Sequence, residues 1–365
     1  MTALKARLHQ APDEAFALEE LHARGWTDGL PVVIPTPERV EVMIAGGGID
    51  PDIILGAVGP GFGEATVEKV AVNAVMAGCL PEHFPVVVAA VRAVCDDRFD
   101  LGVLQSTTHG LGPVIIVNGP AREICGGVAS GWGALGPGHR ANATIGRALR
   151  LVMGNVGGAR PGRSDMAVLG QAGKFTSCLA EAEESSPWEP LHVARGLRHD
   201  QSAVTVVGVE APHSVIMTPD GDDLEGGERM LRTLAASIVQ PGANSTYGGN
   251  GTTLVVLNPA HARRLAKDGY TRAAVQQRLH ELAVTAKATL NTYAPMRPYP
   301  PQDGQDLVKA LRTPEKVVVA VAGGEGIYSA VFNCWGGGDH GVIPVTTEIE
   351  VAQVCELPVG PIGRD

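Results

Sequence analysis

The chain has few aromatic residues, no closely spaced cysteine pair and no long apolar run. Phe, Trp and Tyr make up 4% of its 365 residues, and none of the six cysteines forms a Cys-x-x-Cys pair. Isolated thiols in a chain of this length favour a reducing compartment and argue against a small disulfide-stabilised fold. No apolar run reaches the roughly 18–20 residues that span a bilayer, and residues 1–16 lack the apolar core of a signal peptide. We therefore expect a cytoplasmic protein with no membrane partner.

A basic stripe is also missing. The formal net charge is −10, so a nucleic-acid partner is not expected. The chain is 44% hydrophobic and 19% charged, which is ordinary for a globular protein with a core of normal size. Glycine is abundant, with 47 residues, and predicts several tight functional loops. We expect a small-molecule substrate as partner, and no feature of the sequence identifies a cofactor.

Helical patterns and short apolar runs alternate along the chain. The patterns predict helices at 13–24, 36–46, 65–78, 81–94, 142–153, 228–239 and 271–283, and one that starts at Pro259. Buried strands are predicted at 113–117, 204–209, 254–257 and 316–321. This alternation predicts an α/β fold with mixed or parallel sheets and flanking helices. We expect two domains, residues 1–200 with most candidate site residues and residues 201–365 with a glycine-rich loop, and we find no internal sequence repeat.

The strongest candidate for chemistry is the polar segment around Cys178. A thiol needs a base or a nearby positive charge to become a nucleophile, and Lys174 and His192 are candidates for that task. Glu181 or Glu184 is a candidate to orient the base. Cys178 and Glu181 share a face if the segment is helical and lie on opposite faces if it is a strand. The alternative is an acidic surface helix with a buried structural cysteine.

A glycine-rich loop, residues 126–138, leads into a helix that begins near Asn142, and residues 131–142 are the candidate site within it. Such a loop presents backbone N–H groups to an anion, and His139 and Arg140 would add positive charge. The loop lacks the Gly-Lys-Ser/Thr of a Walker A motif and does not follow a strand at the spacing of a dinucleotide-binding fingerprint. We expect Arg140 and Asn142 to bind a carboxylate or phosphate, with a purely structural loop as the alternative.

Three further residues are candidates for substrate binding. His109 lies in a loop before the strand at 113–117 and is a candidate general base or ligand. Asn118 follows the end of that strand, where α/β proteins place ligand-binding groups. Trp188 stands among the acidic residues that follow Cys178.

The sequence positions of Cys79 and of the C-terminal glycine-rich segments are weaker evidence for a functional role. Cys79 follows the helix at 65–78, whose C-terminal dipole raises a thiol pKa, so its position indicates packing. Residues 323–328 and 333–340 combine glycines with polar residues and with Cys334. They are candidates for a lid or a site rim, or for a surface loop.

Metal-binding motifs are missing from the sequence. It contains no His-Glu-x-x-His, no Cys-x-x-Cys and no His-x-His. The spacing does not predict a metal site from the remaining candidate ligands. Only the fold would bring them close enough to bind one ion: Cys178, Glu181, His192 and His213. We therefore predict no metal ligand, with a Cys/Glu/His metalloenzyme as an alternative.

The first 200 residues resemble a bacterial family known as UGSC-type (seleno)proteins. The matching segments are Gly25-Trp26-Thr27-Asp28-Gly29-Leu30-Pro31, residues 73–79 (Asn-Ala-Val-Met-Ala-Gly-Cys), residues 136–138 and 140–148, and the run from Cys178 to His192. The family name implies thiol or selenol chemistry. The resemblance favours Cys79, Arg140, Asn142, Cys178 and Glu181 as site residues, and it makes Cys79 a catalytic candidate. The chain departs from the family name at Cys125-Gly126-Gly127-Val128, which matches only the first half of Cys-Gly-Ser-Cys.

Together these observations predict a cysteine-dependent enzyme, a hydrolase or lyase of a C–N or C–S bond, that acts on a small polar, anionic substrate. In this hypothesis Cys178 is the nucleophile or a thiol ligand, and Glu181 or His192 is the acid/base. Lys174 and Arg140 bind negative charge. The alternatives are the metalloenzyme and a thiol redox or ligand-binding module. The apolar helices at 65–94 suggest a homodimer interface.

Overall fold

The computed structural model describes residues 4–218, 225–248, 250–293, 306–333 and 335–350. These residues form two four-stranded sheets, two short two-stranded sheets and the helices that flank them. The predicted α/β class, with mixed sheets and flanking helices, is therefore confirmed. Within these ranges no helix combines the length and the apolarity needed to cross a membrane.

The helices and strands predicted from the sequence are all present, within a few residues of the predicted ends. In chain order the α-helices are α1 (Glu14–Ala23), α2 (Pro37–Gly47), α3 (Val67–Ala77), α4 (Phe84–Cys95), α5 (Leu101–Ser106), α6 (Ala121–Ile124), α7 (Arg140–Asn155), α8 (Leu191–Ala194), α9 (Gly226–Ile238), α10 (Asn244–Gly248), α11 (Pro259–Lys267), α12 (Arg272–Leu282) and α13 (Lys287–Tyr293). The strands are β1 (Ile54–Val58), β2 (Gly63–Thr66), β3 (Gly112–Asn118), β4 (Cys178–Ala180), β5 (Ala203–Val209), β6 (His213–Ile216), β7 (Thr253–Leu257), β8 (Val284–Ala286), β9 (Leu307–Lys309), β10 (Val317–Val321), β11 (Tyr328–Phe332) and β12 (Val345–Glu348).

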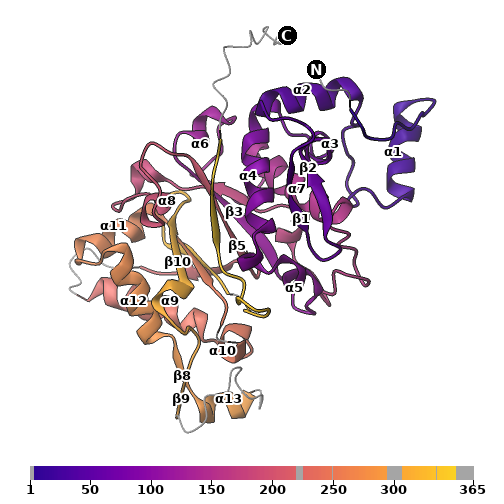
Figure 1. Cartoon of the computed structure of the whole chain (residues 1–365). Coiled ribbons are helices and arrows are strands. Elements are labelled where there is room, and N and C mark those ends of the chain that lie inside the picture. The colour runs from indigo at the N-terminus through magenta and orange to yellow at the C-terminus, as the bar shows by residue number, and fades with distance from the viewer. Residues whose placement is uncertain (1–3, 219–224, 249, 294–305, 334, 351–365) are drawn as a thin grey trace.

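Two sheets pack face to face, and helices cover their outer faces (Figure 1). The first sheet has the strand order β12-β5-β3-β4, and the second has the order β10-β7-β11-β6. Helices α3, α4 and α7 share a core with the first sheet, and helices α9, α11 and α12 share one with the second. The result is a four-layer α/β/β/α arrangement.

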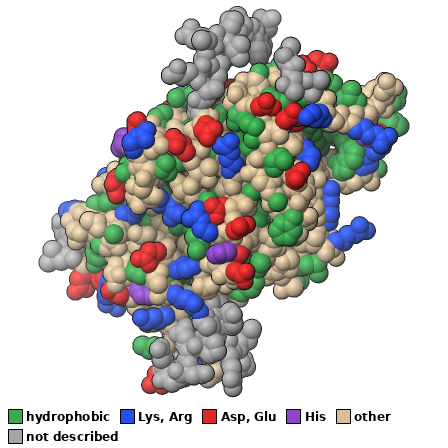
Figure 2. Space-filling model, in the orientation of Figure 1, with side chains coloured by type: hydrophobic (Ala, Val, Ile, Leu, Met, Phe, Trp, Pro, Cys, Tyr) green, Lys and Arg blue, Asp and Glu red, His purple; other side chains and the backbone are tan. Residues whose placement is uncertain are grey.

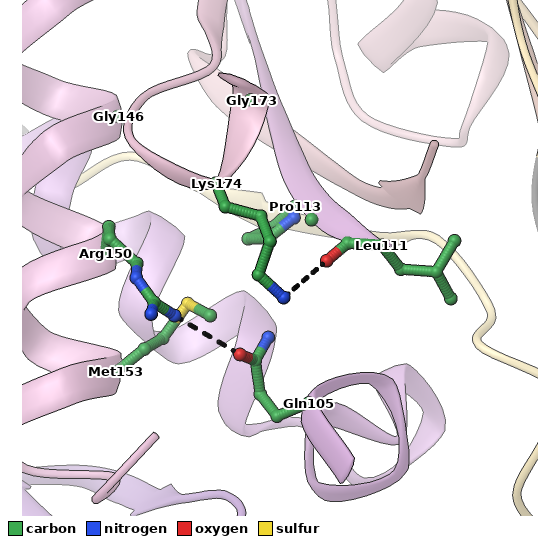
Figure 3. Close-up of a pocket in the computed structure, with 9 residues that line it drawn as sticks. Gln105, Leu111, Pro113, Gly146, Arg150, Met153, Gly173 and Lys174 are labelled. Atoms are coloured by element: carbon green, nitrogen blue, oxygen red, sulfur yellow. Dashed lines mark hydrogen bonds between the residues drawn. The ribbon is translucent and has the colours of Figure 1, made fainter. Parts of the chain in front are cut away.

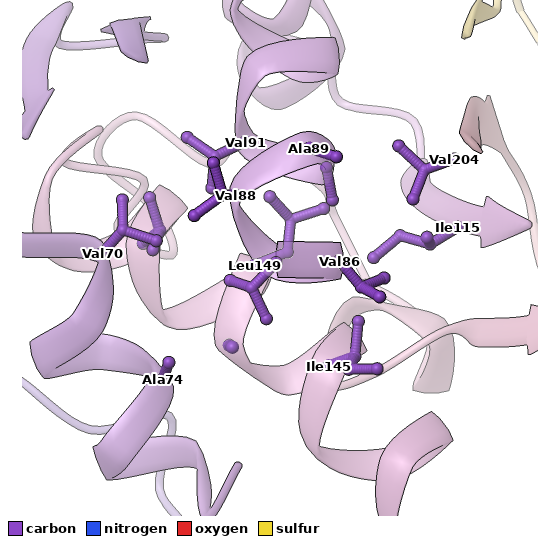
Figure 4. Close-up of a cluster of buried hydrophobic side chains, with 14 of the residues drawn as sticks. Val70, Ala74, Val86, Val88, Ala89, Val91, Ile115, Ile145, Leu149 and Val204 are labelled. Carbon is purple, nitrogen blue, oxygen red and sulfur yellow. The ribbon is translucent and has the colours of Figure 1, made fainter. Parts of the chain in front are cut away.

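The alternation of side chains along the strands explains these layers. In β3, Ile115 and Val117 point to the helices, whereas Val114 and Ile116 point to the second sheet. Figure 4 shows the helix side of this sheet, where Ile115 meets side chains of α4 and α7. Because both faces are buried, β3 is a continuous apolar run in the sequence, which is why it was predictable.

The strand connections of the two sheets repeat one pattern. Strand β3 pairs parallel with β4 and antiparallel with β5, and β7 pairs parallel with β10 and antiparallel with β11. The first half of this repeat runs from β3 to β6 and the second from β7 to β12. The last strand of each half lies in the other half's sheet, so that β6 pairs with β11 and β12 pairs with β5. A short sequence signal accompanies the repeat, since β3 ends in Val117-Asn118 before Pro120 and β7 ends in Leu257 before Asn258-Pro259. The fold therefore contains an internal repeat that the sequence analysis did not detect.

The domain boundary near residue 200 stays a prediction. Strands from both sides of it share the first sheet, because β5 and β12 come from the C-terminal part of the chain and β3 from the N-terminal part. A common core of aliphatic side chains also fills the space between the two sheets. The exchange of β6 and β12 thus ties the two halves of the chain together.

Helices α3 and α4, which suggested a homodimer interface, bury most of their side chains within the chain. Their apolar surface packs on the first sheet and on α7, so the core explains it, and the homodimer stays a prediction. On the face shown in Figure 2, acidic and basic side chains are interspersed. The net negative charge is therefore not gathered in one patch on that face.

Candidate functional site

Cys178 lies in β4, with its side chain in the core between the first sheet and its helices. The residue is 3% exposed, and burial raises the pKa of its thiol. Within the described part of the chain, no hydrogen bond or ion pair joins Cys178 to Lys174, Glu181 or His192, whose partners lie elsewhere. The expected catalytic group is therefore not assembled, because the segment is a strand that directs successive side chains to opposite faces.

Glu181 is fully buried at the junction of the two halves. Its Oε1 forms an ion pair with Nη2 of Arg272 from α12 at 2.9 Å. Its Oε2 accepts hydrogen bonds from Asn118 Nδ2 and from the Leu191 backbone N–H, each at 2.6 Å. With these contacts the carboxylate is saturated, so Glu181 and Asn118 hold the fold together and do not face a substrate.

Trp188 and His192 belong to the same junction. The Trp188 indole donates to the Tyr270 backbone oxygen at 2.9 Å, and the guanidinium of Arg272 lies 5.8 Å from its ring centroid. His192 is completely buried, and neither ring nitrogen has a hydrogen-bond partner among the described residues. A Glu183 carboxylate oxygen lies 4.0 Å from His192 Nδ1. The His192 ring is therefore closed to a bound substrate, whereas Trp188 is partly exposed.

Asn142 holds the glycine-rich loop and does not offer a group to an anion. Its Oδ1 accepts from the Ala129 N–H at 2.8 Å, and its Nδ2 donates to the Ala129 and Ala134 oxygens at 2.9 Å each. The side chain is 3% exposed and uses its whole amide group in these bonds. The structural alternative therefore applies to Asn142.

Arg140 and Cys79 are neighbours on another part of the surface. Arg140 donates to the Gly78 backbone oxygen at 3.1 and 3.2 Å, and both Arg140 and Cys79 line a surface depression of about 310 Å³. Cys79 is 7% exposed, and burial raises the pKa of its thiol to about 12. The dipole argument and the burial argument agree that this thiol is not activated.

His109 joins the two halves of the chain. Its Nε2 lies 3.0 Å from Glu210 Oε1, and its Nδ1 lies 3.0 Å from Asn244 Nδ2. It does not line the cleft described next. Of the C-terminal candidates, residues 323–328 border a separate groove, and Cys334 lies outside the described residues.

Lys174, another expected catalytic residue, faces a larger cleft. The cleft has a volume of about 410 Å³ and lies between α7, the segment at residues 159–175 and the loop at residues 27–28. Helix α7 contributes Arg150, and the irregular segment contributes Arg160 and Asp165. Three separate parts of the chain thus meet at this cleft.

Positive charge dominates the cleft. Asp165 is 3% exposed, and its Oδ1 accepts from Lys174 Nζ at 2.9 Å while its Oδ2 lies 3.2 Å from Arg150 Nη2. The second carboxylate, Asp28, is paired with Arg147 at 2.7 Å. Arg160 donates to the Gly25 and Asn155 oxygens and has no carboxylate partner among the described residues. Three cations thus face one available carboxylate.

Burial lowers the pKa of two of the cleft's cations, Lys174 and Arg160. Burial lowers the pKa of Lys174, although Asp165 acts in the opposite direction. Burial, and then the charge of Arg150, lowers the pKa of Arg160. Burial, the largest single influence, would raise the pKa of Asp28, but the hydrogen bonds and the charge of Arg147 together with backbone hydrogen bonds outweigh it, so that this pKa is lowered. Burial is thus the main reason why the pKa values of Lys174 and Arg160 are lowered.

A small cavity of about 10 Å³ lies between Lys174, Arg150 and Gln105 (Figure 3). Lys174 Nζ donates to the Leu111 backbone oxygen at 3.2 Å, and Arg150 donates to Gln105 Oε1 at 3.3 Å. The Gln105 amide nitrogen is buried and has no partner in the described part of the chain. A space of this size has room for one water molecule, and a free buried donor favours a polar occupant.

Arg150, Arg160 and Asp165 were missed by the sequence analysis. The available signal was the Arg147-x-x-Arg150 spacing, which places both arginines on one face of α7. Among the described residues, no group of three or more His, Cys, Asp and Glu side chains could hold a metal ion. Cys178, Glu181, His192 and His213 thus do not form the ligand set of the metalloenzyme alternative.

The comparisons with known proteins leave the cleft as the main guide to function. No protein-family model matches the chain, and no curated protein or solved structure matches it. The resemblance to the UGSC-type family therefore stays a prediction.

Proposed function

We propose that this protein binds a small anionic molecule, a carboxylate or a phosphate ester, in the Lys174 cleft, and that Lys174 exchanges a proton with it. The observation that supports binding is the excess of cations. Lys174, Arg150 and Arg160 line the cleft, and among the described residues Asp165 is the only carboxylate that compensates them. Partly buried cations bind carboxylates and phosphates through charge-assisted hydrogen bonds. The volume of about 410 Å³ suits a small molecule.

The lowered pKa of Lys174 supports the proton-exchange role. An amine works as a base only when it is neutral, and burial increases its neutral fraction. Asp165, which also lines the cleft, holds the amine at 2.9 Å. Cysteine-dependent hydrolysis or lysis is the alternative, but the burial of Cys178 favours the lysine.

Loss of a cleft cation is expected to weaken anion binding. We expect Arg160→Gln to raise the Kd for succinate and for inorganic phosphate by about tenfold, because one charge-assisted hydrogen bond is lost. Lys174→Met is expected to have an effect of similar size. Isothermal titration calorimetry at low salt measures both.

Arg198→Gln is the matched control, since Arg198 is exposed and pairs with Asp200 on the surface. It should leave both Kd values unchanged. Equal affinities for the native protein, Arg160→Gln and Arg198→Gln would contradict the binding proposal.

The proton-exchange role is tested by the pKa of Lys174. Because the Asp165 carboxylate raises this pKa and burial lowers it, Asp165→Asn should lower it further, whereas the exposed control Asp200→Asn should leave it unchanged. Titration of the ¹⁵N-labelled lysine side chain by NMR gives the value directly. A native pKa at or above the usual range of about 10.4 would rule out Lys174 as the proton-exchanging group.

A further inference from the structure

The two halves of the fold differ where their parallel strands end. Asn118 is the last residue of β3 and Asn258 directly follows β7, and the two hold matching places. Glu181 and Ala322 hold matching places after β4 and β10. The Glu181 N–H donates to the Val117 oxygen of β3, and the Ala322 N–H donates to the Leu257 oxygen of β7. By the same count Glu183 corresponds to Gly324. In the first half both carboxylates accept from Asn118 and occupy the space at the strand ends.

The second half has no carboxylate at the two matching positions. Asn258 turns instead to the backbone oxygens of Gly326 and Tyr328, at 2.9 and 2.7 Å. Ala322 and Gly324 leave the strand ends open, and a groove of about 460 Å³ lies there. The repeated position that is sealed in the first half is therefore accessible in the second.

The floor and the rim of this groove differ in character. Leu179, Val256 and Ala322 form an apolar floor that is continuous with the core between the sheets. Trp132 and Tyr328 stand on the rim and are 74% and 57% exposed. Exposed aromatic rings over an apolar floor are typical of small-molecule sites. A ligand that covers both surfaces removes apolar area from contact with water, which is favourable.

Trp132 is held in place by its contact with Gly324. A Cβ atom at Gly324 would overlap the indole ring, so the ring lies directly on the glycine backbone. The Trp132 backbone oxygen also lies 3.0 Å from His139 Nε2, which fixes the loop. The glycine at the position of Glu183 thus both opens the groove and positions an aromatic ring beside it.

The charge of the groove differs from that of the Lys174 cleft. Among the groove-lining residues, all of which the structure describes, Glu325 is the only Asp, Glu, Lys, Arg or His. Its carboxylate pairs with Arg263 at 2.7 Å. The groove therefore offers no free cation to an anion, whereas aromatic faces attract uncharged rings and cations.

We propose that this groove is a second binding site, for a small planar aromatic molecule that is uncharged or positively charged and packs against Trp132 and Tyr328. The site is separate from the Lys174 cleft and does not depend on the function proposed for it.

Three indole probes of similar size test the proposal. Tryptamine is cationic, tryptophol is uncharged and indole-3-acetate is anionic. We expect tryptamine and tryptophol to bind at least about tenfold more tightly than indole-3-acetate binds at this groove. Trp132→Ala and Gly324→Ala should each weaken tryptamine binding by roughly tenfold, the first by removing the ring and the second by displacing it. Calorimetry gives the affinities. Binding that is present in the native protein and absent from Trp132→Ala is assigned to the groove.

Phe16→Ala is the matched control, because Phe16 is an exposed aromatic residue of α1 that does not line the groove. It should leave the three affinities unchanged. No tryptamine binding up to about 10 mM, a Trp132-dependent preference for indole-3-acetate, or equal effects of Trp132→Ala and Phe16→Ala would each overturn the proposal.

Discussion

Arg272→Met is expected to destabilise the protein by about 3–5 kcal/mol, because it leaves the fully buried Glu181 carboxylate without its cation. Arg272 also donates to the backbone oxygens of Val319 and Glu189, and both acceptors would lose a hydrogen bond. The measurement is the free energy of unfolding from urea denaturation. The effect should be large because this ion pair joins the end of β4 to α12, across the two halves of the chain.

Two further variants separate the charge effect from general damage. The first is Arg263→Met, which breaks the exposed ion pair Arg263–Glu325 after β7 and β10. The corresponding ion pair after β3 and β4 is Arg122–Glu184. Arg263→Met should lower the free energy of unfolding by no more than about 1 kcal/mol. The double variant Glu181→Gln with Arg272→Met should recover part of the loss, since the glutamine side chain would place no charge in the junction. If Arg272→Met cost no more than Arg263→Met, the junction would not be important for stability.

The four described cysteines are expected to resist alkylation in the folded protein. Burial raises the pKa of Cys79, Cys95 and Cys125 from 9.0 to about 12, and it raises that of Cys178 as well. A rise of this size lowers the thiolate fraction at neutral pH by about a thousandfold, and the thiolate is the reactive form. Iodoacetamide labelling with peptide-resolved mass spectrometry should show rates lower by that factor than for the same thiols in guanidinium chloride.

This experiment also decides between the lysine and the cysteine hypotheses. Labelling of Cys178 should become appreciable only as the pH rises far above neutral, because its folded-state pKa is raised. Fast labelling of Cys178 near pH 7 in protein that remains folded would restore the cysteine-dependent hydrolase or lyase. In that case the roles assigned to Lys174 and Arg160 would have to be reassigned.

Local patterns were enough to predict most of the secondary structure. Strands β3 and β7 are buried on both faces, so each is an uninterrupted apolar run between breaker residues. Helix α2 begins with the cap Thr36 before Pro37 and ends at Gly48, whose left-handed conformation stops it. Strands β6 and β12 are among those that were not predicted. Each has four residues and an exposed edge, and each is stabilised by a partner strand that is distant in the sequence.

Residue types alone did not locate the functional groups. Lys174 was found because it stands in a polar segment, but the residues that give it a role come from α7 and from the loop at 159–165. Glu181 has the residue type of a catalytic acid, and only its distant partner Arg272 shows that it is structural. Cys178 has the residue type of a nucleophile, and its burial depends on which face of β4 meets the helices.

The sequence by itself determined the α/β class and the positions of the main helices and strands, because each depends on residues close together in the chain. The tertiary structure decided the face-to-face packing of two sheets, the exchange of β6 and β12, and the cation-rich cleft. It also decided that carboxylates fill the strand ends at Glu181 and that the matching strand ends at Ala322 border the Trp132 groove. Burial and long-range pairing set these features, since the pKa of a side chain and its access to a ligand depend on what the fold packs around it.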